Sequence, residues 1–597
     1  MKGDVPEMRR RRKLLVAGCA LAAGVTLAAC SSSGTSSNGS TSNGGTSGGT
    51  ASFNTAINSV VNPSSGKGGT LTYGVAATPD SFDGGNEYYA WTLNLNRLWE
   101  TPLTTYKSCP GACSNTIIPG IATSLGQVSA NGLVWTYHIK QGLKFSDGTP
   151  ITSADVKYAV ERTYDRGVLG NGPTYFQVLL ADPKYAGPYK DKTGDLTSVT
   201  TPDANTIEFH LAAPFPDFDY VVAFPQTAPV PKAKDTGANY QQNPVSSGPY
   251  MFQSYQLNKQ AVLVPNPNWT QNESPEAKQA ASKIIIDLNM NQQDLDNRLL
   301  AGDIDIDAQG TGLGAAARAK VLSNPNLKKN VDAAAGNREW FTYINTKVAP
   351  LNNLACRQAV EYAANKTDLQ TAWGGPFAGG AIATTLLLPG QGGYSPIDLY
   401  NAKSQPTGDI SAAKAALQRC GHPNGFTTGA SYRSDRPTET AAIQALQASL
   451  ARVGIQLQLH GYPSGSYYGT FAGVPNYVHQ HGLGILAGGW APDWPDGYGM
   501  MDALVNGNAI AATGNANLGE LNDPAVNNLF TQANSPKLSK PQRDALYGQI
   551  DKIAMQQAVI LPNVYAQNLI YRSPNATNVM GYPAYGAYNY AVIGASG

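Results

Sequence analysis

The stretch that decides the fold covers residues 131–165, NGLVWTYHIKQGLKFSDGTPITSADVKYAVERTYD. Residues 134–139, VWTYHI, are β-branched and aromatic, which favours a half-buried strand. Asp147-Gly148 predicts a tight turn, because glycine adopts a positive φ without steric cost. Thr152, with Asp155 three residues later, predicts a capping box at the start of a helix. We therefore expect a strand, a turn and a helix here.

Strands and helices alternate along the rest of the chain. Periodicity predicts strands at residues 70–75, 206–211, 284–286 and 455–459, and helices at residues 90–99, 412–419, 439–452 and 540–556. Such a mixture indicates α/β lobes around largely buried sheets. At 597 residues the chain exceeds what one hydrophobic core usually serves, so several lobes are expected.

The N-terminus predicts an exported lipoprotein. A basic cluster at residues 9–13 precedes an apolar run, residues 14–27, that is shorter than the about 20 residues needed to span a bilayer. Leu27-Ala28-Ala29-Cys30 resembles a lipobox, in which small residues precede a cysteine that is lipidated as the signal is cleaved. We expect residues 1–29 to be the signal peptide and Cys30 to carry the lipid. The paired arginines leave the export route open between Sec and twin-arginine.

Residues 31–50 are almost entirely Ser, Gly, Thr and Asn, which predicts a flexible tether within residues 30–65. Residues 45–49 match the G-x-S-x-G pattern of a hydrolase nucleophile elbow. That elbow requires a strained strand-to-helix turn, which a low-complexity tether does not provide. We interpret the match as accidental.

The charge balance does not indicate a nucleic-acid partner. Removing the signal takes away six basic and two acidic residues and leaves 36 basic and 39 acidic residues, a net charge near −3. The 31 tyrosines suit aromatic-lined clefts. No later segment is long and apolar enough to cross a bilayer, so the lipid is the expected membrane attachment.

Four cysteines remain after the signal and the lipidated cysteine, and outside the cytoplasm they are expected to pair. Cys109 and Cys113 bracket a Pro-Gly-Ala turn and can close a small loop. By elimination, Cys356 joins Cys420 and links two predicted helices. The sequence alone does not fix this connectivity. Cys-x3-Cys without further ligands nearby is a poor zinc signal.

The run GLKFSDGTPITSADVKYAVER resembles the signature of the extracellular solute-binding proteins of family 5, the peptide- and nickel-binding receptors of ABC importers. Further segments resemble the same family in order, from residue 68 to residue 597: SSGPYMFQSY at 246–255, NPNW at 266–269, AGDIDI at 301–306, INT at 344–346 and ACRQAVEYAANKTDL at 355–369.

The resemblance implies an α/β, periplasmic binding protein-like type II fold of class C, with two main lobes, an extra α/β lobe and a hinged ligand cleft. Lobe I is expected to comprise residues 66–104, 245–340 and 563–597. The extra lobe II is expected at residues 105–244, and lobe III at residues 341–562.

The sequence contains few candidates for catalytic or metal-binding residues. Only His479-Gln480-His481 is suggestive, because alternation on a strand would place both imidazoles on one face, but a metal site needs more donors and a second shell. A surface loop is the alternative. There is no HExxH and no phosphate-binding loop. No catalytic residue, metal or cofactor is predicted.

Residues 482–502, GLGILAGGWAPDWPDGYGMMD, are the strongest candidate for ligand binding. They predict a buried strand, a Gly-Gly pair that permits close approach, and an irregular segment presenting Trp490, Asp493 and Trp494. The segment resembles the family pattern Trp-x-x-Asp-aromatic-x-Asp/Glu-Pro, in which peptide-binding members hold the peptide's α-amino group with the first carboxylate. That residue falls on Asp493, which the resemblance makes the amine anchor, with the two tryptophans beside it. Gly497 stands where the family often has proline, and Pro492 precedes the acid.

These observations together predict a monomeric receptor, lipid-anchored to the outer face of the cytoplasmic membrane. It is expected to capture dipeptides or oligopeptides and deliver them to an ABC permease driven by cytoplasmic ATPases. Two alternatives stay open. One is the same fold binding a nickel chelate, a sugar or another solute, and the other is a secreted hydrolase.

Overall fold

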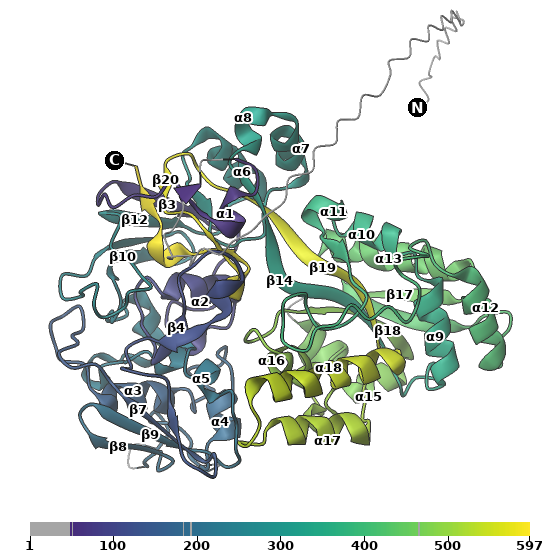
Figure 1. Ribbon diagram of the computed structural model, residues 1–597, viewed down its shortest axis with the longest axis horizontal. Helices are drawn as coiled ribbons and strands as arrows, with labels where there is room; N and C mark the ends of the chain where they lie inside the picture. The colour runs from purple at the N-terminus through teal and green to yellow at the C-terminus, as the bar shows by residue number, and fades with distance from the viewer. Residues whose placement is uncertain (1–47, 50–51, 183, 192–193, 464–465, 597) are drawn as a thin grey trace, which may run out of the picture. The chain divides into compact units, whose positions relative to one another are not determined.

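The computed structural model describes residues 48–49, 52–182, 184–191, 194–463 and 466–596 (Figure 1). The predicted signal peptide, Cys30 and most of the predicted tether lie outside these residues. Within them, no helix combines the length and the apolar character that a membrane crossing requires.

The five-stranded sheet joins the beginning of the described chain to its middle. Its order is β10-β11-β12-β3-β13, formed by β3 (Thr70–Gly74), β10 (Tyr250–Gln256), β11 (Gln260–Pro265), β12 (Lys283–Asp287) and β13 (Ile306–Asp307). β12 and β13 run parallel to β3. The core of this sheet also takes in C-terminal residues, among them Tyr588 and Ile593. Segments from both ends of the described chain therefore share one core.

The stretch at residues 131–165 folds as expected. β6 (Gln127–Val128), β7 (Val134–His138), β8 (Val199–Asp203) and β9 (Thr206–His210) form an antiparallel sheet in the order β6-β7-β9-β8. Gly148 adopts a φ of 86° in the turn. α3 (Ser153–Arg162) starts at Thr152, whose backbone N–H donates to the Asp155 carboxylate at 2.8 Å in a complete capping box. The predicted strand, turn and helix are confirmed.

The six-stranded sheet has the order β15-β19-β14-β18-β16-β17. Its strands are β14 (Val331–Ile344), β15 (Ala381–Ile382), β16 (Thr427–Arg433), β17 (Gln456–Tyr462), β18 (Leu483–Trp490) and β19 (Ile560–Tyr571). Helices cover both faces. α9 (Leu354–Ala363), α10 (Lys366–Ala372), α12 (Ile410–Arg419) and α13 (Pro437–Ala451) pack on one face, and α16 (Gly497–Val505), α17 (Pro524–Ala533) and α18 (Lys540–Gln556) on the other. Ile485 joins the first cluster and Leu486 the second, which explains the unbroken apolar run in β18.

The remaining helices of the described residues are short or lie at the edges of the sheets. They are α1 (Thr55–Asn58), α2 (Ala90–Asn96), α4 (Tyr175–Leu179), α5 (Phe218–Val221), α6 (Gln292–Ala301), α7 (Ala315–Ser323), α8 (Pro325–Lys328), α11 (Gly375–Ala378), α15 (Pro475–Gln480), the π-helix η6 (Tyr467–Phe471), and the 3-10 turns η1 (Gly84–Asn86), η2 (Gly111–Asn115), η3 (Pro225–Thr227), η4 (Lys232–Lys234), η5 (Gly237–Gln242), η7 (Gly507–Ala509), η8 (Pro583–Tyr585) and η9 (Tyr590–Val592). Small two-stranded pairings complete the fold: β1 (Gly48–Gly49) with β2 (Val60–Val61), β4 (Thr104–Tyr106) with β5 (Ile117–Pro119), β20 (Ala576–Thr577) with β23 (Gly594–Ala595), and β21 (Gly581–Tyr582) with β22 (Ala587–Tyr588).

β14 and β19 are long paired strands, visible side by side in Figure 1. Residues 331–335 pair with residues 567–571, and residues 339–343 pair with residues 560–565, with a register shift between Ala335 and Glu339. The expected lobe boundaries after residues 340 and 562 therefore fall inside continuous strands. The division of the chain into lobes stays a prediction.

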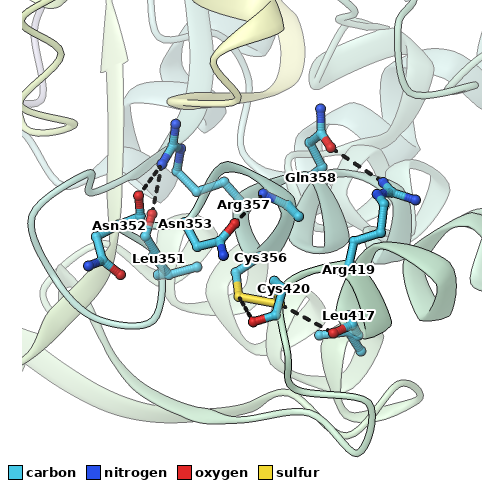
Figure 2. Close-up of a disulfide and its surroundings, with 10 residues drawn as sticks. Leu351, Asn352, Asn353, Cys356, Arg357, Gln358, Leu417, Arg419 and Cys420 are labelled. Carbon is cyan, nitrogen blue, oxygen red and sulfur yellow. Dashed lines mark hydrogen bonds between the residues drawn. A yellow bond between two sulfur atoms is a disulfide. The ribbon is translucent and has the colours of Figure 1, made fainter.

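Two disulfides are present among the described residues. Cys356 in α9 is joined to Cys420 at the end of α12, with Cα atoms 5.3 Å apart (Figure 2). Cys109 is joined to Cys113, with Cα atoms 5.9 Å apart. Beside the first bridge, the Arg357 guanidinium donates to the carbonyl oxygen of Leu351 at 2.9 Å and so ties α9 to the loop that precedes it.

Candidate functional site

The candidate ligand-binding segment lies between β18 and α16. β18 ends at Trp490, and the Asp496 side chain accepts the Gly499 N–H at 3.1 Å as the N-cap of α16. Between them, the Asp493 N–H donates to the Gly499 carbonyl oxygen at 3.2 Å. A strand end and a capped helix start therefore fix both ends of the loop that presents Asp493.

Gly497, which replaces the proline frequent in the resembling family pattern, has a packing reason. It is the first residue of α16, and a Cβ atom there would overlap the Tyr547 side chain of α18. Tyr547 is buried against this helix. A glycine is needed because α16 and α18 approach each other closely at this point.

Asp493 is held by two tyrosines from distant parts of the chain. The Tyr88 hydroxyl donates to Oδ1 at 2.7 Å, and the Tyr175 hydroxyl, at the start of α4, donates to Oδ2. These partners lie 405 and 318 residues away in sequence. Each carboxylate oxygen therefore has one donor and keeps further acceptor capacity.

The environment of Asp493 is poor in positive charge. The side chain keeps part of its surface accessible, although protein atoms surround it closely. Burial raises the pKa of the Asp493 carboxyl to about 6, the two tyrosine hydrogen bonds oppose the shift, and the charge of Asp502 adds to it. No cation is among the partners of Asp493 in the described residues. Among the described residues, the carboxylate therefore has two neutral hydrogen-bond donors and no charged partner.

Glu87 positions the tyrosine segment. Its carboxylate accepts the backbone N–H groups of Tyr88 at 2.8 Å, Tyr89 at 2.7 Å and Ser81 at 3.2 Å. Burial raises the pKa of Glu87 to about 7 in spite of these bonds. The segment is thereby fixed by a buried acceptor, and Tyr88 and Tyr89 project from it with partly exposed rings.

The two tryptophans have different places. Trp490 is half-buried, and its indole N–H donates to the Gly499 carbonyl oxygen at 3.3 Å. Trp494 is only 1% exposed. Its ring stacks on Tyr498 and on Tyr220, and it meets the edge of Phe215, with centroid distances of 6.0, 6.2 and 6.0 Å. Trp494 therefore anchors the loop in the aromatic core around the four-stranded sheet, where protein side chains surround its ring.

The predicted Gly-Gly pair also serves packing inside the protein. A Cβ atom at Gly489 would overlap the ring of Trp340, and one at Gly488 would collide with the ring of Tyr343. Both rings belong to β14, which pairs with β18 here. The close approach permitted by these glycines is made by aromatic side chains of the neighbouring strand.

A positive group lies on the same sheet. Arg433, at the end of β16, pairs with the Glu439 carboxylate. Arg338, in β14, lies over the ring of Trp340 with Cζ 5.0 Å from its centroid. The positive charges of Arg433 and Arg436 both help to lower the pKa of Arg338.

The histidine pair is not on a strand. His479 lies in α15 and its Nε2 is 2.8 Å from Glu520 Oε1, whereas His481 follows the helix and stacks on Tyr477 with a centroid distance of 3.8 Å. The expected alternation fails because the segment is helical. Among the described residues, no group of three His, Cys, Asp or Glu side chains is arranged to hold a metal ion.

Sequence reasoning proposed Asp493 as a site residue but did not predict its hydrogen-bond partners. Tyr88 and Tyr175 carry no spacing signal toward a residue more than 300 positions away. The aromatic run NEYYAW at residues 86–91 was a usable hint, since Glu87 beside two tyrosines is unusual ahead of a helix. No sequence pattern marked Arg338, which lies inside strand β14.

Comparisons with known proteins identify the family and the fold. Residues 116–512 match the family model described as bacterial extracellular solute-binding proteins, family 5 Middle. A solved structure described as clavulanic acid biosynthesis oligopeptide binding protein 2 is 37% identical, with a TM-score of 0.88 over 92% of this chain and 99% of that chain. A probable D,D-dipeptide-binding periplasmic protein of Escherichia coli is 28% identical over 82% of this chain and 87% of its own length.

The fold is shared more widely. A periplasmic binding protein from Helicobacter pylori, solved in complex with the peptide STSA, is 20% identical with a TM-score of 0.69 over 89% of this chain. The unliganded open form of a murein tripeptide-binding protein gives the same TM-score at 21% identity. The predicted type II periplasmic binding protein fold is confirmed. The match of the family model over more than half of the chain shows that this protein belongs to the bacterial extracellular solute-binding proteins of family 5.

Proposed function

We propose that the protein is the substrate-binding lipoprotein of an ABC importer and that it captures short peptides outside the cell. The observation that carries this proposal is Asp493, a closely surrounded carboxyl with two tyrosine donors and no cation among its partners in the described residues. The 37% identical structure described as an oligopeptide-binding protein supports a peptide as the ligand class.

The α-ammonium group of a peptide fits the vacant acceptor capacity of Asp493. An ammonium group carries three donors, and each Asp493 oxygen already accepts one tyrosine hydroxyl and can accept more. Enclosing an ammonium without a partner would cost several kcal/mol, which the carboxylate offsets. The partly accessible rings of Tyr88, Tyr89 and Trp490 offer apolar surface to the first side chains.

The test combines one mutation with one chemical change in the ligand. Asp493→Asn keeps the shape and removes the charge, so affinity for a free-amine peptide should fall by about a hundred- to several thousandfold, the 3–5 kcal/mol cost of breaking a buried pair. Acetylating the peptide amine should cost the unmutated protein a similar factor and the Asn variant little more. Calorimetry on the four combinations measures the coupling. Equal affinity for acetylated and free peptides would rule out Asp493 as the amine anchor.

Native mass spectrometry of protein purified from its host, before dialysis, distinguishes the ligand classes. Bound oligopeptides support the proposal, whereas a metal chelate or a sugar would assign the same fold to another solute. Turnover of an added substrate would be required for a hydrolase. The lipid at Cys30, the permease with its ATPases, the monomeric state and the location at the outer face of the cytoplasmic membrane belong to the same proposal.

A further inference from the structure

Asp496 lies beside a second carboxyl that comes from another part of the chain. Asp496 is the N-cap of α16, and its side chain is buried. Asp217, which directly precedes α5 and is also buried, lies within hydrogen-bonding reach of it. α16 packs into the core of the six-stranded sheet, whereas α5 packs into the core of the four-stranded sheet. Two buried carboxyls therefore meet where these two cores adjoin.

Within the described residues, the cation bonded to this pair is Arg543 in α18. Its guanidinium donates to Asp217 Oδ1 at 3.1 Å. Lys540, three residues earlier in α18, is paired with Asp544 at 2.8 Å instead. If both carboxyls were ionised, two buried negative charges would share one bonded arginine. Like charges in a buried place are strongly unfavourable, so one carboxyl is expected to keep its proton.

The hydrogen bonds indicate that the proton is on Asp496. Asp217 accepts from Arg543, whereas Asp496 Oδ1 accepts only the Gly499 backbone N–H, at 3.1 Å, and its other oxygen can carry an O–H donor. The Tyr547 hydroxyl is buried within the electrostatic reach of both carboxyls, yet it has no hydrogen-bond partner among the described residues. An ionised Asp496 would attract this donor, so the unused hydroxyl agrees with a neutral carboxyl.

The electrostatics of the surrounding elements agree with a shared proton. Burial raises the pKa of Asp496 well above its ordinary value, and the charge of Asp217 and the hydrogen bond to it raise it further. The Gly499 N–H and the charge of Lys540 oppose the shift. The other titratable groups around the pair are acids and phenols, namely Tyr106 in β4, Asp219 and Tyr220 in α5, Tyr498 and Asp502 in α16, and Asp544 and Tyr547 in α18.

This carboxyl pair lies three residues from the proposed amine anchor. Asp493 accepts the hydroxyl of Tyr175, which packs against the core of the four-stranded sheet. Trp494, the residue after Asp493, is buried in that same core. The loop is thus joined to the four-stranded part of the protein at Asp493, at Trp494 and, through Asp217, at Asp496.

Resting on the proposed peptide-receptor function, we infer that Asp496 carries a proton, donates it to Asp217 and thereby positions the loop that presents Asp493. Asp496 is a positioning residue, because it acts on the ligand through Asp493. Loss of the proton places two like charges face to face and weakens the contact between α16 and α5.

The first experiment compares the ligand-free full mature chain with Asp496→Asn. The amide has nearly the same shape, stays neutral at every pH, and keeps an acceptor for Gly499 and a donor for Asp217. A pKa that is higher in the folded state than the unfolded value of about 3.9 means that Asp496 adds stability below pH 4 and loses it as the pH rises.

The measured quantity is the unfolding equilibrium constant of the unmutated protein divided by that of Asp496→Asn. This ratio should rise by about tenfold per pH unit from about pH 5 until the pH reaches the folded-state pKa. Urea unfolding at steps of half a pH unit measures the ratio. The infrared difference spectrum between the two proteins at pH 7 should contain the band of one protonated carboxylic acid.

Two further variants locate the effect. Asp217→Asn should reduce the slope of the unmutated protein, because the amide offers a donor to an ionised Asp496 and removes the like charge. Asp523→Asn is the matched control. Asp523 is the N-cap of α17, where it accepts the Ala525 N–H at 2.8 Å, and its other oxygen accepts the Gln557 amide at 3.3 Å. The ratio for this control should not change with pH over the same range.

Peptide affinity at pH 7 tests the positioning. Asp496→Leu removes the hydrogen bonds to Gly499 and Asp217 and should lower the affinity for a free-amine peptide by about tenfold. Asp496→Asn should recover most of that loss, because it restores both hydrogen bonds without restoring the charge. Calorimetry with one free-amine peptide measures the three affinities.

Each outcome decides one point. A ratio that stays constant with pH, or a difference spectrum without the carboxylic acid band, overturns the shared proton whatever the peptide results are. Equal peptide affinities of the Leu and Asn variants overturn the positioning role. Absence of peptide binding by the unmutated protein overturns the receptor function itself, while unfolding and infrared spectroscopy still decide on the proton. They also give the decision if Asp496→Leu does not fold.

Discussion

At the scale of single residues, the proposed role of Asp493 predicts that ligand binding depends on pH. Burial raises its pKa to about 6 in the ligand-free protein, and an ammonium ligand favours the ionised form. Affinity for a free-amine peptide should therefore be full above pH 6 and fall by about tenfold per pH unit below it. Above about pH 8 the peptide amine loses its proton and affinity falls again. Calorimetry between pH 5 and 9 measures the curve.

The controls for this profile follow from the same charge. Asp493→Asn should flatten the acid side, and an acetylated peptide should give a flat curve throughout. A fall below pH 6 that persists in the Asn variant would assign the titration to another group, with Glu87 as the first candidate because its pKa is about 7. In the ligand-free protein, the folding stability contributed by Asp493 changes with pH in the opposite direction to the ligand affinity. A folded pKa above the unfolded value of about 3.9 means that Asp493 adds stability below pH 4 and loses it as the pH rises through 6.

At the scale of helices and strands, local signals were enough where chain neighbours decide the structure. α18 has the predicted bounds, Lys540–Gln556, and the structure adds a capping box of Ser539 and Gln542 at its start. The capping box at Thr152 was predicted from Thr152 and Asp155 alone. The helix predicted at residues 90–99 ends at Asn96, since the chain turns there to bury Trp99 beside Phe82.

The ligand site was only partly predictable for the opposite reason. A family pattern marks Asp493 as the candidate, but its two hydrogen-bond partners come from residues brought close only by folding. Trp494 was expected beside the ligand, and its ring is instead packed among Phe215, Tyr220 and Tyr498. An aromatic residue after an acid has the same sequence signal in both cases, since burial depends on what the rest of the chain places around it.

The two disulfides should differ in their effect on stability. Their sequence separations are 64 and 4 residues. In the chain-entropy model, replacing Cys356 and Cys420 by serine lowers the free energy of unfolding by about 4 kcal/mol, and replacing Cys109 and Cys113 lowers it by about 2 kcal/mol. Urea unfolding of both double variants checks the order. Equal losses, or free or crossed cysteines in non-reducing peptide mapping, would contradict the assignment.

At the scale of the whole molecule, the lipid anchor predicted at Cys30 decides where the receptor works. Cys30→Ser should release the protein from membranes without changing its unfolding temperature, because Cys30 takes part in neither disulfide. A single acyl chain attaches a protein only marginally, so loss of the diacyl modification is sufficient for release. Cell fractionation measures this. A serine variant that stays wholly in the membrane fraction would refute the anchor.

The core shared by the two ends of the described chain has a consequence for folding during synthesis. Tyr73, in β3, donates its hydroxyl to the carbonyl oxygen of Tyr590, 517 residues later. β3 also lacks its parallel neighbours β12 and β13 until these strands have been synthesised. At a synthesis rate of about 5–20 residues per second, β3 stays without its contact to Tyr590 for roughly half a minute or longer. During that interval the core that contains Tyr73 and Tyr590 stays incomplete. A secretion channel that accepts only unfolded chains could therefore engage the polypeptide before this core forms.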